Sequence, residues 1–205
     1  YQGKQKIWSD YQKEIPDDHY FYVRSCIRQN LFPASEKTFL DITRNKLGKD
    51  FFETEHHTTC GGIAYHCDAI PQETSMTIIA RQFALMHKNG YENYVCSCIT
   101  SFGLYTETLE TWREFPELEA KIRENLWKTC KLEFAKPKYL AHASDIIYKY
   151  RNLIAAQAKY KLINRHTGQP LRVVEHIGCH YGKMFPSKSV GGAEYPYVLA
   201  GMIEA

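Results

Sequence analysis

The segment HHTTCGGIAYHCDAI, residues 56–70, concentrates side chains that can bind a metal or take part in redox chemistry. Cys60 precedes a glycine pair, Cys67 follows seven residues later, and three histidines lie close to them in the sequence. Thiolates and imidazoles bind zinc, iron and iron–sulfur clusters, and a free thiolate can also act as a nucleophile. Glycine pairs, by contrast, are most common in turns. Which chemistry applies depends on the thiols that the rest of the chain brings to Cys60.

The chain has seven cysteines among 205 residues. An odd number, in a chain long enough to bury a core, indicates reduced thiols or metal ligands and not a disulfide framework. This favours a reducing compartment, the cytoplasm, with the protein either free or held at a membrane through partner subunits. The cysteines are Cys26, Cys60, Cys67, Cys96, Cys98, Cys130 and Cys179.

Composition excludes several other classes of function. Hydrophobic residues make up 44% and charged residues 24% of the chain, which is typical of a folded globular protein. The net charge of +3 is spread among acidic residues without a basic block, so nucleic-acid binding is not indicated. No apolar run approaches the roughly 18 residues of a membrane span, and no transmembrane segment is predicted.

Strands and helices alternate in the first hundred residues. Aromatic and β-branched residues predict a strand over 20–25, and shorter patterns predict strands over 50–55 and 93–98. A helix is expected from Ser35 to a stop at Gly48, and an amphipathic helix over 73–90. This alternation predicts an α/β fold.

Three cysteines lie at or after the ends of the three predicted strands. Cys26 and Cys60 lie in the loops after the first two strands and Cys98 is the last residue of the third, and the loops after such strands converge on one edge of an α/β sheet. We therefore expect their sulfurs to approach one another in a single site. Cys96 lies two residues before Cys98, so an extended backbone would direct both side chains to the same face, and Cys96 is a further candidate ligand.

The chain also contains a short internal repeat. The segments FYVRSCIRQNLFPAS (21–35) and VEHIGCHYGKMFPSK (174–188) share a cysteine and a following Phe-Pro in a common register of 153 residues. Cys179 would then open a second site. Apolar residues over 198–203 predict the first helix of that second unit, which indicates a longer subunit of about 290 residues.

The predicted organisation has three parts. Residues 18–111 form a first cysteine-rich unit, and residues 112–168 form a helical connector with helices over 115–134 and 142–160. Residues 169–205 begin a second, incomplete unit. The expected architecture is therefore two pseudo-symmetric cysteine-rich α/β units joined by helices.

These motifs resemble the catalytic B subunit of heterodisulfide reductase and its relatives, a family of cysteine-rich CCG-domain proteins. Each unit of that family has a cysteine, a long gap, Cys-Cys-Gly, a second long gap and CxxC. Here 33 residues separate Cys26 from Cys60 in TCGG, and 37 separate Cys60 from Cys98 in CITSFG. HIGCHYGKMFPSK is similar to the opening of the second unit, and the resemblance covers residues 18–105 and 140–190.

The chain departs from the family pattern at two positions. Thr59 replaces the first cysteine of Cys-Cys-Gly, and Ser101 replaces the second cysteine of CxxC. In the family, five thiolates hold a noncubane iron–sulfur cluster, and three cannot reproduce that coordination unless Cys96 or Cys67, both off the pattern, also bind. The resemblance then implies a simpler cluster, such as 4Fe–4S, since iron–sulfur centres take about four soft ligands. Hydrogen bonds to cluster sulfurs are the expected role of the two hydroxyls.

The resemblance implies roles for further residues. Gly61 and Gly62 would let the backbone approach the cofactor. Zinc is an alternative metal, although Cys179 with His176 and His180 supplies three ligands where a closed zinc site needs four. The candidate metal ligands are Cys26, Cys60, Cys98 and Cys179, which fit the family pattern, and Cys96, which lies off it; the candidate cofactor contacts are Thr59, Ser101, Gly61 and Gly62.

The implied function is that of an oxidoreductase subunit acting on a disulfide, a thiol or a sulfane-sulfur carrier. The sequence has no ferredoxin run of the type CxxCxxCxxxCP, so electrons would arrive through partners. The family implies a ferredoxin-like iron–sulfur subunit (C-type) and a flavin subunit (A-type). The alternative is a structural or zinc-binding docking subunit without catalysis, in a quinone reductase-type complex.

Overall fold

The computed structural model describes residues 15–56, 59–158, 163–174, 176 and 198–205. The chain divides into two compact units, Ile15–Ala143 and a second that combines Tyr1–Glu14 with Ser144–Ala205. The first unit contains the sheet and most of the cysteines. Cys179 and Phe185 lie outside the described residues, so the repeat register and the second site stay predictions.

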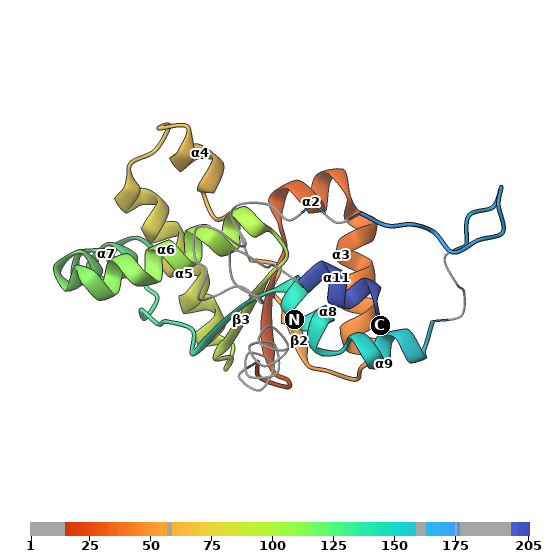
Figure 1. Cartoon of the computed structure of the whole chain (residues 1–205). Helices are drawn as coiled ribbons and strands as arrows, with labels where there is room; N and C mark the ends of the chain where they lie inside the picture. Colours follow the sequence, from red (N-terminus) through yellow and green to blue (C-terminus); the bar gives the residue numbers. More distant parts are fainter. Residues whose placement is uncertain (1–14, 57–58, 159–162, 175, 177–197) are drawn as a thin grey trace. The chain divides into compact units, whose positions relative to one another are not determined.

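A parallel four-stranded sheet forms the centre of the first unit (Figure 1). Its strand order is β2-β1-β3-β4, and Tyr20 of β1 pairs with both Phe51 of β2 and Asn93 of β3. The three strands expected from the sequence are present, and the α/β class is confirmed. The strands are β1 (Tyr20–Val23), β2 (Phe51–Glu53), β3 (Asn93–Cys96) and β4 (Tyr139–His142).

Helices cover both faces of this sheet (Figure 1). On one side α5 (Gln72–Lys88) and α6 (Ile99–Glu114) pack with α7 (Pro116–Cys130). On the other side α2 (Cys26–Leu31) leads into α3 (Pro33–Leu40). The remaining helical segments of this unit are the π-helical turn η1 (Asp41–Lys46) and the short α4 (Gly62–His66).

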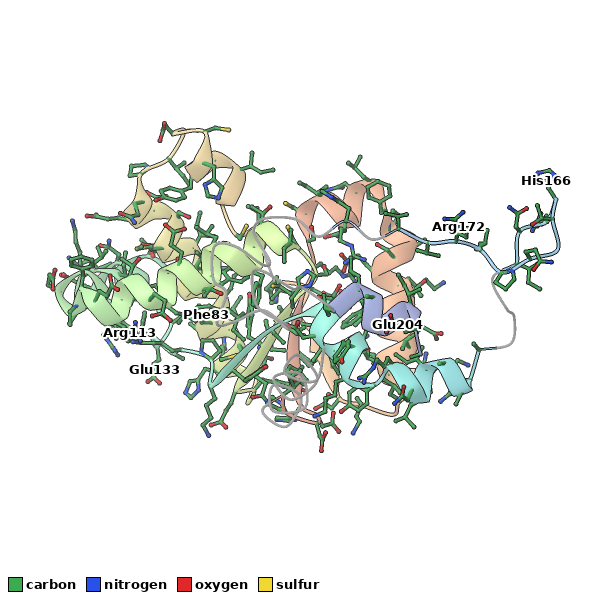
Figure 2. The ribbon with its side chains drawn as sticks, in the orientation of Figure 1. Phe83, Arg113, Glu133, His166, Arg172 and Glu204 are labelled. Carbon is green, nitrogen blue, oxygen red and sulfur yellow. The ribbon has the colours of Figure 1, made fainter. Side chains whose placement is uncertain are left out.

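The core lies between the sheet and the layer of α5, α6 and α7. Phe83 of α5 is fully buried there (Figure 2) and packs edge-on against Tyr94 and Trp112. Burying each of these large rings contributes about 1.5–3 kcal/mol to the free energy of unfolding, before the entropy lost on ordering the side chain is subtracted. This core fixes α5 and α6 against β3, and both helices then supply side chains to the cysteine loops.

Three elements differ from the sequence expectation. Residues 99–114 form the long helix α6 although their threonines and glycine are weak helix formers, because burial of Phe102, Tyr105 and Trp112 outweighs local propensity. Residues 139–142 form strand β4, which is too short to show a pattern and is defined by its pairing with β3. The helix expected from Ser35 starts at Pro33, and Cys26 begins a helix of its own.

The second unit contains three short helices among its described residues. Helices α8 (Ala143–Lys149) and α9 (Arg151–Ala156) occupy most of the predicted span 142–160, with an interruption at Tyr150. The Arg151 guanidinium stacks on the Tyr148 ring at 4.0 Å. Helix α11 (Val198–Ile203) agrees with the helix expected over 198–203. Within the described part of the chain, no helix is both long and apolar enough to cross a membrane.

The buried ring of His142, at the end of β4, makes the stability of the fold depend on pH. Burial lowers the pKa of His142 to about 4, and the charge of Arg28 adds to this effect. The unfolded chain takes up this proton near pH 6.5, so the stability contributed by the neutral ring is present above about pH 6.5 and is lost toward pH 4. Between about pH 7.5 and 4.5 this residue should account for a loss of about 2 kcal/mol.

Urea unfolding at the two pH values measures this loss. His142→Gln should flatten the dependence of the unfolding free energy on pH, whereas His87→Gln, at the exposed end of α5, should leave it unchanged. Equal slopes for wild type and His142→Gln would contradict the assignment.

Candidate functional site

The three cysteines that follow the strands lie at the carboxyl edge of the sheet. Cys26 is the first residue of α2, which follows β1, and Cys98 is the N-cap of α6, which follows β3. Cys60 lies after β2, in the turn that starts α4. Because β2, β1 and β3 are adjacent and parallel, their following loops meet at this edge (Figure 1).

The three thiols share one electrostatic environment. Burial raises the pKa of the Cys60 thiol, hydrogen bonds from Ser101 and Gly62 lower it, and negative charge on Cys98 and Cys26 raises it again. Charges act on one another in this way only at short range or through a poorly screened interior. Ionising Cys60 beside negative charge on Cys26 and Cys98 is therefore unfavourable without a compensating cation.

Two hydroxyls contact the sulfurs. The Ser101 hydroxyl donates to Cys60 Sγ at 3.1 Å, and the Thr59 hydroxyl donates to Cys26 Sγ at 3.6 Å. Thr59 Oγ1 also accepts a hydrogen bond from the Gly61 N–H at 3.3 Å, so its position is set from both sides. The hydroxyls thus act as donors to thiol sulfur.

The two glycines after Cys60 have different roles. Gly61 has a φ of 74°, a left-handed conformation that favours glycine. At Gly62 a Cβ atom would lie 3.2 Å from Cys60 Sγ and 3.3 Å from Leu104 Cδ2. The Gly62 N–H donates to Cys60 Sγ at 3.3 Å, a contact that needs this close approach.

The other candidate residues are placed differently. Cys96 is buried in the core, and its thiol lies 3.7 Å from the Ala141 carbonyl and 3.8 Å from the Cys98 carbonyl. Cys67 is exposed at the end of α4, and Cys130 is half-buried at the end of α7. Cys179 lies outside the described residues.

A polar cluster that sequence reasoning missed lies beside Cys98. Arg28 Nη1 donates to the Ser97 carbonyl at 2.9 Å, and the Ser97 hydroxyl donates to Glu36 Oε1 at 2.6 Å. Burial lowers the pKa of Arg28, while the charge of Cys98 raises it. Arg28 therefore places a positive charge close to a thiol. Its Nε also donates to the Ser35 hydroxyl at 3.2 Å, and no sequence motif indicated this cluster.

The donor set limits the group that this edge can hold. Three thiols and two sulfur-directed hydroxyls suit an iron–sulfur group with three cysteine ligands, and they do not suit a cluster that needs five thiolates. In the described part of the chain, no three His, Cys, Asp or Glu side chains are already arranged to hold a metal ion. Loading would therefore require the thiols to close around the group.

The Ser101 hydroxyl provides a direct test of the site geometry. Its hydrogen bond favours the ionised form of Cys60, so Ser101→Ala should raise the pKa of the Cys60 thiol and slow its alkylation near pH 8 on the order of tenfold. Mass spectrometry of iodoacetamide-treated, metal-free chain measures the rate. Thr106→Val removes a buried hydroxyl from the same helix, one that donates to the Phe102 carbonyl, and should leave the rate unchanged. Equal rates in all three chains would show that Ser101 does not contact Cys60.

Comparison with known proteins identifies similar proteins both by sequence and by structure. No family model matches the sequence. The chain is 24% identical over 200 residues to the B subunit of the ferredoxin:CoB-CoM heterodisulfide reductase from Methanosarcina acetivorans. That match covers 94% of this chain and 62% of the relative, so the chain spans less than two thirds of the relative's length.

A solved structure supports the fold. The crystal structure of a hypothetical protein from Helicobacter pylori matches 69% of this chain and 30% of its own, with a TM-score of 0.52 and 16% identity. At that identity the likeness concerns the fold alone. The sequence match, which extends over nearly the whole chain, supports a relationship to the B subunit of heterodisulfide reductase.

Proposed function

We propose that this chain is a redox subunit of heterodisulfide reductase type, and that Cys26, Cys60 and Cys98 hold an iron–sulfur group at the carboxyl edge of the sheet. The observation that carries the proposal is that the Ser101 and Thr59 hydroxyls donate to the sulfurs of Cys60 and Cys26. The charges of Cys26 and Cys98 also act on Cys60, and the three cysteines follow three adjacent parallel strands. The sequence relationship to a heterodisulfide reductase subunit supports the same chemistry.

The chain's own residues would perform the binding steps. When bound, an iron–sulfur group supplies one-electron transfer. The thiols would bind it as thiolates, and the charge repulsion among them would be offset by its iron ions. The Ser101 and Thr59 hydroxyls and the Gly62 N–H would donate to sulfur, which stabilises the more negative, reduced form.

Arg28 would add a fixed positive charge at the same edge. Its hydrogen bond to the Ser97 carbonyl holds the guanidinium next to the Cys98 loop. A positive charge there favours reduction and also attracts an anionic partner or substrate. We propose a disulfide, a thiol or a sulfane-sulfur carrier as the substrate class, because two one-electron steps beside sulfur allow a two-electron sulfur bond to be opened or formed.

We further propose that electrons enter through a ferredoxin-like iron–sulfur subunit and a flavin subunit. Apolar side chains within a few residues of Cys26 and Cys60, on α2, directly after it and on α4, are exposed, and Leu31 is 68% exposed. Exposed apolar side chains beside a redox site suit a docking surface. These side chains are Ile27, Leu31, Phe32 and Ile63.

Metal analysis of cysteine variants tests the proposed group. Cys26→Ser, Cys60→Ser and Cys98→Ser should each lower the iron and acid-labile sulfide content severalfold or more, because each removes one of three soft ligands. Cys67→Ser and Cys130→Ser are the matched controls and should retain wild-type content. Zinc in place of iron, or no metal in anaerobically purified wild-type chain, would contradict the iron–sulfur assignment.

Co-expression tests the docking surface. Leu31→Glu should lower recovery of the iron–sulfur and flavin subunits on affinity purification, and the iron content of the chain should not change. Leu153→Glu alters a comparably exposed leucine on α9 and serves as the control. A wild-type chain that is active and cluster-loaded on its own would contradict the need for partners.

A further inference from the structure

Gln82 is a fully buried amide in the middle of α5. It lies on the helix face that carries the buried Ile79 and Phe83. An amide in such a position destabilises the fold by a few kcal/mol unless its polar atoms are hydrogen-bonded. The polar partners of Gln82 therefore explain why an amide occupies this position.

The Gln82 amide links the core to the cysteine loop. Its Nε2 donates to the Thr59 carbonyl at 2.9 Å, across 23 residues of sequence. Its Oε1 accepts hydrogen bonds from the hydroxyls of Tyr94 at 2.5 Å and Tyr105 at 2.8 Å. A carbonyl can only accept, so the contact with Thr59 fixes which end of the amide faces the loop.

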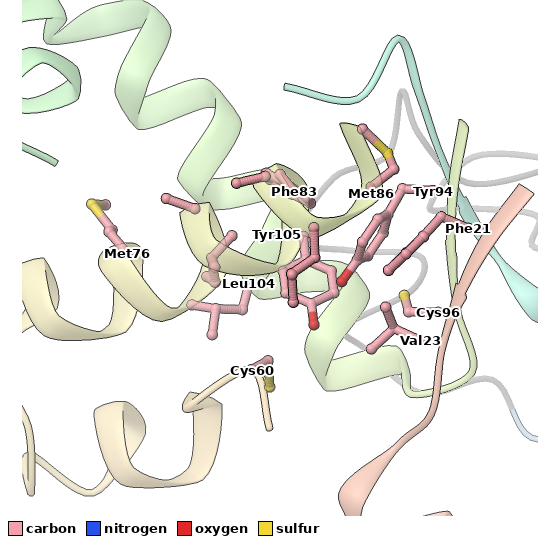
Figure 3. Packing of buried hydrophobic residues seen from close by; sticks show 14 of the residues in the cluster. Phe21, Val23, Cys60, Met76, Phe83, Met86, Tyr94, Cys96, Leu104 and Tyr105 are labelled. Carbon is pink, nitrogen blue, oxygen red and sulfur yellow. The ribbon is translucent and has the colours of Figure 1, made fainter. Parts of the chain in front are cut away.

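The two tyrosines hold the other end of the amide. Burial raises the pKa of Tyr94 and of Tyr105 well above its ordinary value, and charge on Cys60 raises both further. Both hydroxyls therefore stay protonated and remain donors to Gln82. Figure 3 shows the two rings in the core, with Cys60 and Cys96 below them.

We propose that Gln82 is a positioning residue for Cys60. Its hydrogen bond to the Thr59 carbonyl fixes the position of the Thr59–Cys60 peptide relative to α5. Cys60 Sγ can then accept hydrogen bonds from both the Gly62 N–H and the Ser101 hydroxyl. The same bond orients Thr59, whose hydroxyl contacts Cys26. The inference about the thiol stands on this geometry, and its extension to metal retention rests on the proposed function.

Gln82→Met tests the inference, because it keeps the side-chain length and removes the donor to Thr59. In the reduced, chelator-treated chain, iodoacetamide should alkylate Cys60 on the order of tenfold faster than in wild type. Cys60 is only 8% exposed, so access of the reagent limits its rate, and a released loop gains more from exposure than it loses with the Ser101 and Gly62 hydrogen bonds. Exposed Cys67 in the same chain is the internal reference, and its rate should not change. In the iron-loaded chain, iron release to a chelator should accelerate by a similar factor.

Tyr105→Phe is the matched control, because it removes a hydroxyl bonded to Gln82 and leaves the bond to Thr59 in place. It should destabilise the core in a urea unfolding measurement and leave the Cys60 rate near that of wild type. An unchanged Cys60 rate in Gln82→Met, or an equal increase in Tyr105→Phe, would overturn the positioning role.

A replacement variant and a metal-independent measurement cover the cases in which the first experiment fails. If Gln82→Met does not fold, Gln82→Leu serves instead, because its smaller apolar side chain also has no donor for the Thr59 carbonyl. A faster Cys60 rate in that variant supports the role, and a wild-type rate overturns it. If wild-type chain binds no iron, the proposed function fails, but the alkylation rates still decide the role of Gln82.

Discussion

The candidate site depends on the parallel register of three neighbouring strands. Tyr20 is level with Phe51 on one side and Asn93 on the other, so β2, β1 and β3 end at nearly the same height. Parallel strands cannot be joined by tight turns, and each connection therefore continues into a helix that returns across the sheet. The loop at the start of each connection contains one thiol. A slip of register in any strand would move its cysteine away from the other two.

Charge is the second constraint on this edge. Negatively charged thiolates that lie close together repel one another. Three hydrogen-bond donors contact the sulfurs here: the Gly62 N–H, the Ser101 hydroxyl and the Thr59 hydroxyl. Arg28 adds a full positive charge near Cys98. Such an edge stabilises negative charge on sulfur more than a purely apolar core would. A cationic group would be attracted by the thiolates themselves and not by these donors.

Hydrogen bonds in the core hold the Cys60 loop at the carboxyl edge of the sheet. Tyr94 belongs to β3, Tyr105 to α6 and Gln82 to α5, and their hydrogen bonds meet at one amide that also holds the Thr59 carbonyl. A buried polar network of this kind is favourable only when its members are satisfied together. The loop that contains Cys60 is thus connected to elements from three parts of the chain.

Local pattern in the sequence determined the strands over 20–25, 50–55 and 93–98, the amphipathic helix α5 and the placement of Cys26, Cys60 and Cys98 after strands. These features depend on neighbours within a few residues, which is why a pattern reveals them. Helix α6, strand β4 and the Gln82 network depend on burial and pairing between distant segments, and weak local propensity hides them. The family resemblance predicted that the Thr59 and Ser101 hydroxyls donate to sulfur, but only the tertiary structure decided that Thr59 contacts Cys26 and Ser101 contacts Cys60. A hydrogen bond across 33 or 41 residues has no signature in the spacing of the two residues that form it.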